Sequence, residues 1–99
     1  MVTEEVIMEA LRPVEDPELG MSIVDLGLVY RAEDVGEAIE VDFTLTYPGC
    51  PLGDQIQDDI VDRLARAFHT SVRTKLVFVP AWTPARMSEE ARVGMGYPI

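Results

Sequence analysis

The chain has 99 residues, 47% of them hydrophobic, with one cysteine and a formal net charge of −10. This length fits a single domain over residues 1–99, and the negative charge argues against a nucleic-acid partner, whose phosphates are bound by Lys and Arg. With no apolar run near 18 residues, no signal-peptide pattern and no second cysteine for an internal disulfide, we expect a cytoplasmic protein without a membrane partner.

The first predicted helix covers residues 3–12. Thr3 is suited to the N-cap, and Glu4 and Glu5 follow in the first turn, where the helix dipole favours anions. Pro13 is expected to end this helix. Residues 14–27, with an Asp-Pro pair and two glycines, are expected to form irregular turns.

Two strands are predicted next, over residues 28–33 and 38–46, joined by a hairpin in which Gly36 takes a positive φ. The second strand has the clearer pattern. Four apolar residues alternate with four polar ones, which indicates one buried face and one face that is wet or functional. The apolar set is Ile39, Val41, Phe43 and Leu45, and the polar set is Glu40, Asp42, Thr44 and Thr46.

A second helix is predicted over residues 53–68, a third strand over 72–79, and a short helix after Ser88. The order α-β-β-α-β predicts a compact two-layer α+β domain with a small three-stranded mixed sheet and a short C-terminal helix. The third strand follows a helical crossover, so it should run parallel to the second.

The charges are unevenly spread along the chain. Residues 1–62 contain sixteen acids and two bases, whereas residues 63–99 contain two acids and six bases. This distribution suits protein partners or metal ions better than nucleic acid. The simpler interpretation of most of these charges is that they lie on a solvated surface.

Cys50, in the segment 46–51 (TYPGCP), is the main candidate for chemistry. It comes just before the second helix, where free N–H groups and the helix dipole stabilise a thiolate, the form that attacks or binds metal. The alternative is that Cys50 is a small buried hydrophobic residue. The sole histidine, His69, lies beyond the far end of that helix and is expected to be a C-cap or surface residue rather than a partner of the thiol.

A complete metal site within one chain is not expected, because zinc and iron–sulfur sites usually need several thiolates or imidazoles. Asp16, Glu18 and Asp25 offer hard oxygen ligands for a site shared with another molecule. These three residues could equally be turn-forming or capping residues, and for Asp16, which precedes Pro17, this is the better interpretation.

Five segments together resemble the small metal–sulfur cluster biosynthetic family that includes SufT-like and PaaD-like iron–sulfur assembly proteins. They are 16–19 (DPEL), 23–30 (IVDLGLVY), 46–51 (TYPGCP), 80–84 (PAWTP) and 88–92 (SEEAR). The resemblance implies a maturation factor that delivers iron–sulfur clusters to client apoproteins. It places the functional cysteine at Cys50, the acidic loop at Asp16 and Glu18, and the loop threonine at Thr46.

The implied cofactor is iron or an iron–sulfur cluster, held transiently at Cys50 and shared with another molecule. The implied partners are assembly proteins and client apoproteins, and one thiol per chain suggests a homodimer or a hetero-complex. We do not expect an enzyme. Two alternatives stay open: a non-metal adaptor for oxygenase maturation, as in PaaD-like members, and a thiol-dependent enzyme with Asp16, Glu18 or Asp25 as its base.

Overall fold

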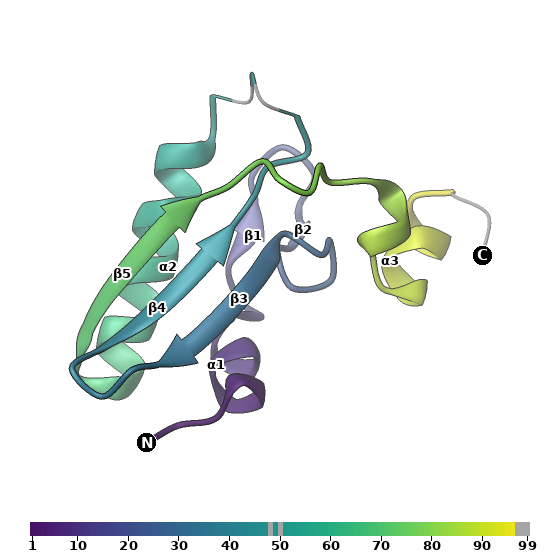
Figure 1. Ribbon diagram of the computed structural model, residues 1–99. Coiled ribbons are helices and arrows are strands. Elements are labelled where there is room, and N and C mark those ends of the chain that lie inside the picture. Colours follow the sequence, from purple (N-terminus) through teal and green to yellow (C-terminus); the bar gives the residue numbers. More distant parts are fainter. Residues whose placement is uncertain (48, 50, 97–99) are drawn as a thin grey trace.

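The computed structural model describes residues 1–47, 49 and 51–96, and it contains two sheets and three α-helices (Figure 1). The helices are α1 (Glu4–Leu11), α2 (Gly53–Phe68) and α3 (Glu89–Gly94), with a 3-10 turn at Pro84–Arg86. The strands are β1 (Glu15–Asp16), β2 (Met21–Ser22), β3 (Val29–Asp34), β4 (Ala38–Phe43) and β5 (Ser71–Leu76). None of the described helices is long and apolar enough to cross a membrane.

The larger sheet has the order β3-β4-β5. β3 and β4 form the predicted antiparallel hairpin, in which Gly36 has φ 95°. β5 runs parallel to β4, as the helical crossover requires. Helices α1 and α2 pack on one face of this sheet, α1 against β3 and α2 against β5, and the opposite face is open (Figure 1). The predicted two-layer α+β fold is therefore confirmed.

One hydrophobic core lies between the sheet and the helices. Alternate residues of β4, including Val41 and Phe43, are fully buried against the apolar stripes of α1 and α2. Met87 and Ala91, from the C-terminal part of the chain, belong to the same buried cluster. The side chains of Thr3 and Ser88 cap α1 and α3 by accepting backbone N–H bonds from Val6 and Ala91, as their positions predict.

Residues 17–20 and 23–27 form turns, as expected, but the sequence did not predict two short strands in the same region. Glu15–Asp16 and Met21–Ser22 pair antiparallel as a separate two-stranded sheet, with Glu15 opposite Ser22. Each strand is two residues long, too short to show the alternation by which a strand is recognised in a sequence. A further hydrogen bond joins the residues that flank the two strands: the Ile23 N–H donates to the Val14 carbonyl at 3.0 Å.

The third strand of the large sheet is shorter than predicted and ends at Leu76. Residues 77–88 form the C-terminal strap. This segment crosses to the turns that precede β3. The Trp82 indole donates to the Leu26 carbonyl at 2.7 Å, and the Tyr30 hydroxyl donates to the Pro80 carbonyl at 2.9 Å. The Val77 N–H still donates to the Phe43 carbonyl at 2.9 Å, and beyond it the strap bonds to Leu26 and Tyr30.

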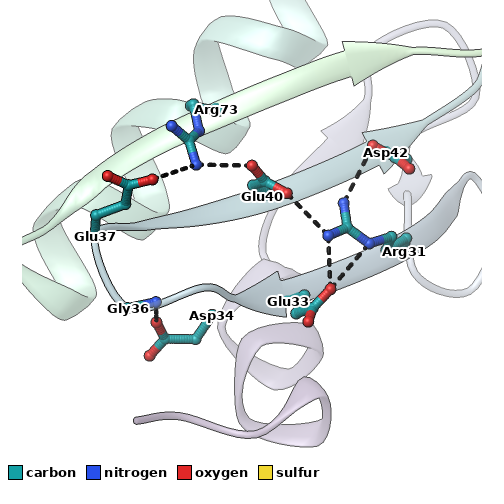
Figure 2. A network of polar contacts seen from close by, with 8 residues as sticks. All are labelled: Arg31, Glu33, Asp34, Gly36, Glu37, Glu40, Asp42 and Arg73. Atoms are coloured by element: carbon teal, nitrogen blue, oxygen red, sulfur yellow. Dashed lines mark hydrogen bonds and ion pairs between the residues drawn. The ribbon is translucent and has the colours of Figure 1, made fainter.

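The open face of the sheet carries a network of charged side chains (Figure 2). Arg31 donates to Glu33 at 2.6 Å and to Glu40 at 2.9 Å, and Arg73 donates to Glu40 at 2.8 Å. The polar residues of β4, Glu40 and Asp42, therefore form ion pairs on the solvent-facing side of the sheet.

Acid should weaken this network through Glu40. The hydrogen bond from Arg31, aided by the charge of Arg73, lowers the pKa of Glu40 below its ordinary value of 4.5. A carboxylate with a lowered folded-state pKa stabilises the fold near neutral pH, and that contribution is lost as the pH falls through the folded-state pKa. Urea unfolding at pH 7 and pH 3 should therefore show a smaller acid-induced loss of stability in Glu40→Gln than in the wild type. An equal loss in both proteins would contradict this assignment.

Candidate functional site

The segment predicted to carry the chemistry joins the carboxyl end of β4 to the start of α2. Two of its residues, Pro48 and the candidate ligand Cys50, lie outside the described residues, so the assignment of Cys50 stays a prediction. The described residues on either side of this segment show where its two ends lie. A Cβ placed on Gly53 would lie 3.2 Å from Leu45 Cδ1 and 3.8 Å from Leu76 Cδ2. The ends of the parallel strands β4 and β5 therefore meet the first residue of α2.

No side chain among the described residues caps the start of α2. Leu52 occupies the N-cap position and offers no hydrogen-bonding side chain, while Asp54 supplies one acidic group in the first turn. Uncapped N–H groups at a helix start favour a nearby anion. This is the electrostatic setting that the sequence predicts after Cys50.

Asp16 is held as a turn-forming residue. It is only 2% exposed, and its Oδ1 accepts the backbone N–H groups of Glu18 at 2.8 Å and of Leu19 at 3.2 Å. Its carbonyl also accepts the N–H of Gly20 at 2.7 Å. These bonds close the turn between β1 and β2, so the turn-forming reading accounts for Asp16 without a ligand.

The other candidate residues have different settings. Glu18 is exposed to solvent, and Thr46 is half-buried. Asp25 forms an ion pair with Arg12, at 3.0 Å between Nη1 and Oδ1. His69 is exposed and ends α2 in the left-handed conformation with φ 52°, as a C-cap. The expectation for His69 is confirmed, and it sits at the end of α2 opposite Gly53.

Sequence reasoning missed Thr44. The alternating pattern predicts it on the polar face, which is wet or functional, but the residue is only 1% exposed. Its Oγ1 is buried, and among residues 1–47, 49 and 51–96 it has no hydrogen-bond partner. The strand has ended one residue earlier, at Phe43, and the backbone N–H of Thr44 donates to Leu28 instead. No signal in the sequence marks this change of environment.

A buried hydroxyl without a partner destabilises a protein, whereas an apolar group of the same shape does not. We therefore expect Thr44→Val to raise the free energy of unfolding by about 1 kcal/mol. Urea denaturation measures this change, with Thr46→Val as a control at a half-buried threonine. A loss of stability in Thr44→Val would mean that the hydroxyl has a partner in the folded protein.

The described part of the chain contains no group of three or more metal-ligating side chains that could hold a metal ion. Asp16 and Asp25, two of the three proposed oxygen ligands, are already engaged by backbone N–H groups and by Arg12. Among the described residues, Asp16, Glu18 and Asp25 therefore do not form a metal site by themselves.

Comparisons with known proteins identify the family of the chain. The model of the family described as "Iron-sulfur cluster assembly protein" matches residues 4–75. The "Fe-S protein maturation auxiliary factor SufT" of Staphylococcus aureus is 42% identical over 85 residues, which cover 84% of this chain and 97% of that protein.

Two further proteins are similar over most of the chain. A crystal structure from Bacillus anthracis, of a domain of unknown function called DUF59, superposes with a TM-score of 0.88 at 34% identity and covers 96% of this chain and 92% of that one. One component of the "Putative 1,2-phenylacetyl-CoA epoxidase" of Escherichia coli is 34% identical over 87 residues, which are 87% of this chain but 53% of that protein.

Proposed function

Because this chain belongs to the iron–sulfur cluster assembly protein family and is a SufT-like member of it, we propose that it is an Fe–S protein maturation factor that passes iron or a cluster to client apoproteins through Cys50. Iron or the cluster is the cargo of this reaction, received from assembly proteins and released to a client. The family match over residues 4–75 is the observation that carries the proposal.

The shortage of metal ligands in the chain favours a transient site that is shared with another molecule. The chain has one cysteine, and the described carboxylates are not grouped to hold a metal ion. An iron–sulfur cluster is usually held by several thiolates, so the remaining ligands would come from a second copy, an assembly protein or the client. Incomplete coordination is suitable for transfer, because the receiving protein can supply the missing ligands.

In this proposal the residues that the family resemblance implies for the site have separate roles. The uncapped start of α2 favours the thiolate form of Cys50. Asp16 shapes the turn that presents Glu18 to solvent, and Thr46 lies at the entrance of the cysteine segment. A reducing cytoplasm suits such a site, since it keeps the thiol free.

Anaerobic reconstitution with iron and sulfide tests the carrier role. We expect the wild type to bind iron with the charge-transfer absorbance of thiolate ligation, and Cys50→Ala to lose both signals. Thermal unfolding of the two proteins checks that the substitution leaves the fold intact. Equal, negligible binding in both proteins would rule out direct iron binding by the chain alone.

A second candidate is an adaptor that recruits clients without binding metal. Two observations favour it: the carboxylate of Asp16 is occupied by the turn, and the chain is similar to the epoxidase component of Escherichia coli. Binding of purified iron–sulfur apoproteins separates the two proposals. An adaptor keeps its affinity for the apoprotein when Cys50 is replaced by serine, whereas a carrier that coordinates through the client loses it.

A further inference from the structure

Strand β5 forms an outer edge of the three-stranded sheet. β4 is its hydrogen-bonded neighbour, in parallel register from Ser71 to Leu76, and the sheet order places no strand on its other side in the described chain. In Figure 1, β5 borders the sheet with α2 behind its face. An edge strand presents unpaired N–H and C=O groups, which another extended segment can pair with.

The strand already paired with β5 indicates which side chains suit this edge. In β4, the acidic residues Glu40 and Asp42 lie opposite Arg73 and Lys75 on the open face. Figure 2 shows Arg73 directed to Glu40, with Asp42 further along the same strand. The intervening residues of β4 are apolar and lie against the helices. Strand β5 is thus complementary to a strand that alternates acidic and apolar residues.

The charges on β5 distinguish between possible occupants of its outer edge. Residues 63–88 contain five basic residues and no acidic ones. Lys75 is exposed, and it has no ion-pair partner within 4.0 Å in the described chain. Like charges placed opposite each other destabilise a pair of strands, so a second β5 is disfavoured as a neighbour. An acidic strand would instead place carboxylates beside Arg73 and Lys75.

The apolar requirement comes from the carboxyl end of β5. Leu76 is 40% exposed and Phe78 is 37% exposed, although both are large apolar residues. Leu76 also lies beside Gly53, the first residue of α2. A strand added to β5 would cover Leu76 and end next to Gly53, which follows the segment 46–51 in the sequence.

From these features we propose that β5 is a docking edge for an extended segment of a partner protein, in which acidic residues alternate with apolar ones. The segment adds to the sheet as a fourth strand. Its carboxylates pair with Arg73 and Lys75 on the open face, and its apolar side chains cover Leu76. The proposal is independent of iron binding, because it uses neither Cys50 nor any metal ligand.

The test uses a synthetic peptide that copies residues 37–46 (EAIEVDFTLT), since β4 is the natural complement of β5. A second peptide has lysine in place of its three acidic residues, and a third has the same composition with the alternation scrambled. Titration into the isotope-labelled full-length protein, followed by NMR, should shift the backbone amides of residues 71–76 with the first peptide only. Amides on the outer edge should also exchange more slowly with solvent.

Two variants with the same change of charge provide the matched control. Lys75→Glu should weaken binding of the acidic peptide about tenfold, because it replaces an attraction across the strand pair with a repulsion. Arg66→Glu, at an exposed position of α2, should leave the affinity within about twofold. Circular dichroism confirms that each variant is folded.

Three results would overturn the proposal. One is binding of the lysine peptide as tight as that of the acidic peptide, a comparison that needs no variant protein. Another is a set of amide shifts that lies away from residues 71–76. The third is a concentration-dependent dimer in sedimentation equilibrium whose formation protects the same amides, since a second copy would then occupy the edge.

Discussion

Replacing Gly27 with alanine is expected to lower the free energy of unfolding by about 3 kcal/mol or more. Gly27 has φ +73°, a conformation that side-chain-bearing residues rarely adopt. A Cβ at this position would also overlap the carbonyl oxygen of Arg86. The C-terminal strap cannot move aside freely, because the Trp82 indole and the Ser88 N–H bond to the carbonyls of Leu26 and Asp25.

The matched control for this substitution is Gly20→Ala. Gly20 has nearly the same backbone conformation, with φ +68°, but a Cβ at this position would have nothing within 4 Å of it. Its replacement should cost only the conformational penalty of about 1 kcal/mol. Urea denaturation of both variants measures the difference, which reports the contact between Gly27 and the strap. Equal losses in the two variants would show that the strap does not press on Gly27.

The second large effect is expected at Asp16. Alanine at this position removes the acceptor of two backbone N–H bonds in a buried turn, so we expect a loss of about 2–3 kcal/mol. Asparagine keeps an oxygen at the Oδ1 position and should cost less than about 1 kcal/mol. Chemical denaturation of the two variants tests this order. A loss in Asp16→Asn as large as that in Asp16→Ala would contradict the turn-forming role.

The same pair of variants separates structure from chemistry. Asp16→Asn retains the turn but removes the negative charge, so iron binding in the reconstitution assay should be preserved if Asp16 only shapes the loop. Loss of iron binding in a stable Asp16→Asn protein would instead assign the carboxylate to the metal. Glu18→Gln tests the second acidic residue in the same assay. Glu18 is exposed, and its side chain accepts none of the backbone N–H bonds that hold the turn.

Most of the fold could be predicted from local patterns. The boundaries of α2 follow from its apolar stripe and agree with prediction at both ends, residues 53 and 68. The alternation in β4 correctly identifies its buried face, since Ile39, Val41 and Phe43 are at most 1% exposed. Side-chain caps at Thr3 and Ser88 could also be recognised, because an N-cap depends on the residue and its immediate neighbours alone.

The features that escaped prediction depend on distant parts of the chain. The β1–β2 pair has too few residues to show a period, and it forms through tertiary contacts. The burial of Thr44 and the early end of β5 both occur where the chain leaves the sheet, a place that no local pattern marks. For the site, five weak segments in order identified the family, whereas the structural role of Asp16 became visible only through its hydrogen bonds.

The shared core has a consequence for synthesis on the ribosome. Ile7 and Leu11, near the N-terminus, belong to the same buried cluster as Met87 and Ala91. Because translation delivers the N-terminal residues first, α1 emerges long before the residues that complete its surroundings. The nascent chain therefore cannot close its core until α3 has left the exit tunnel, whatever the order in which the earlier elements form.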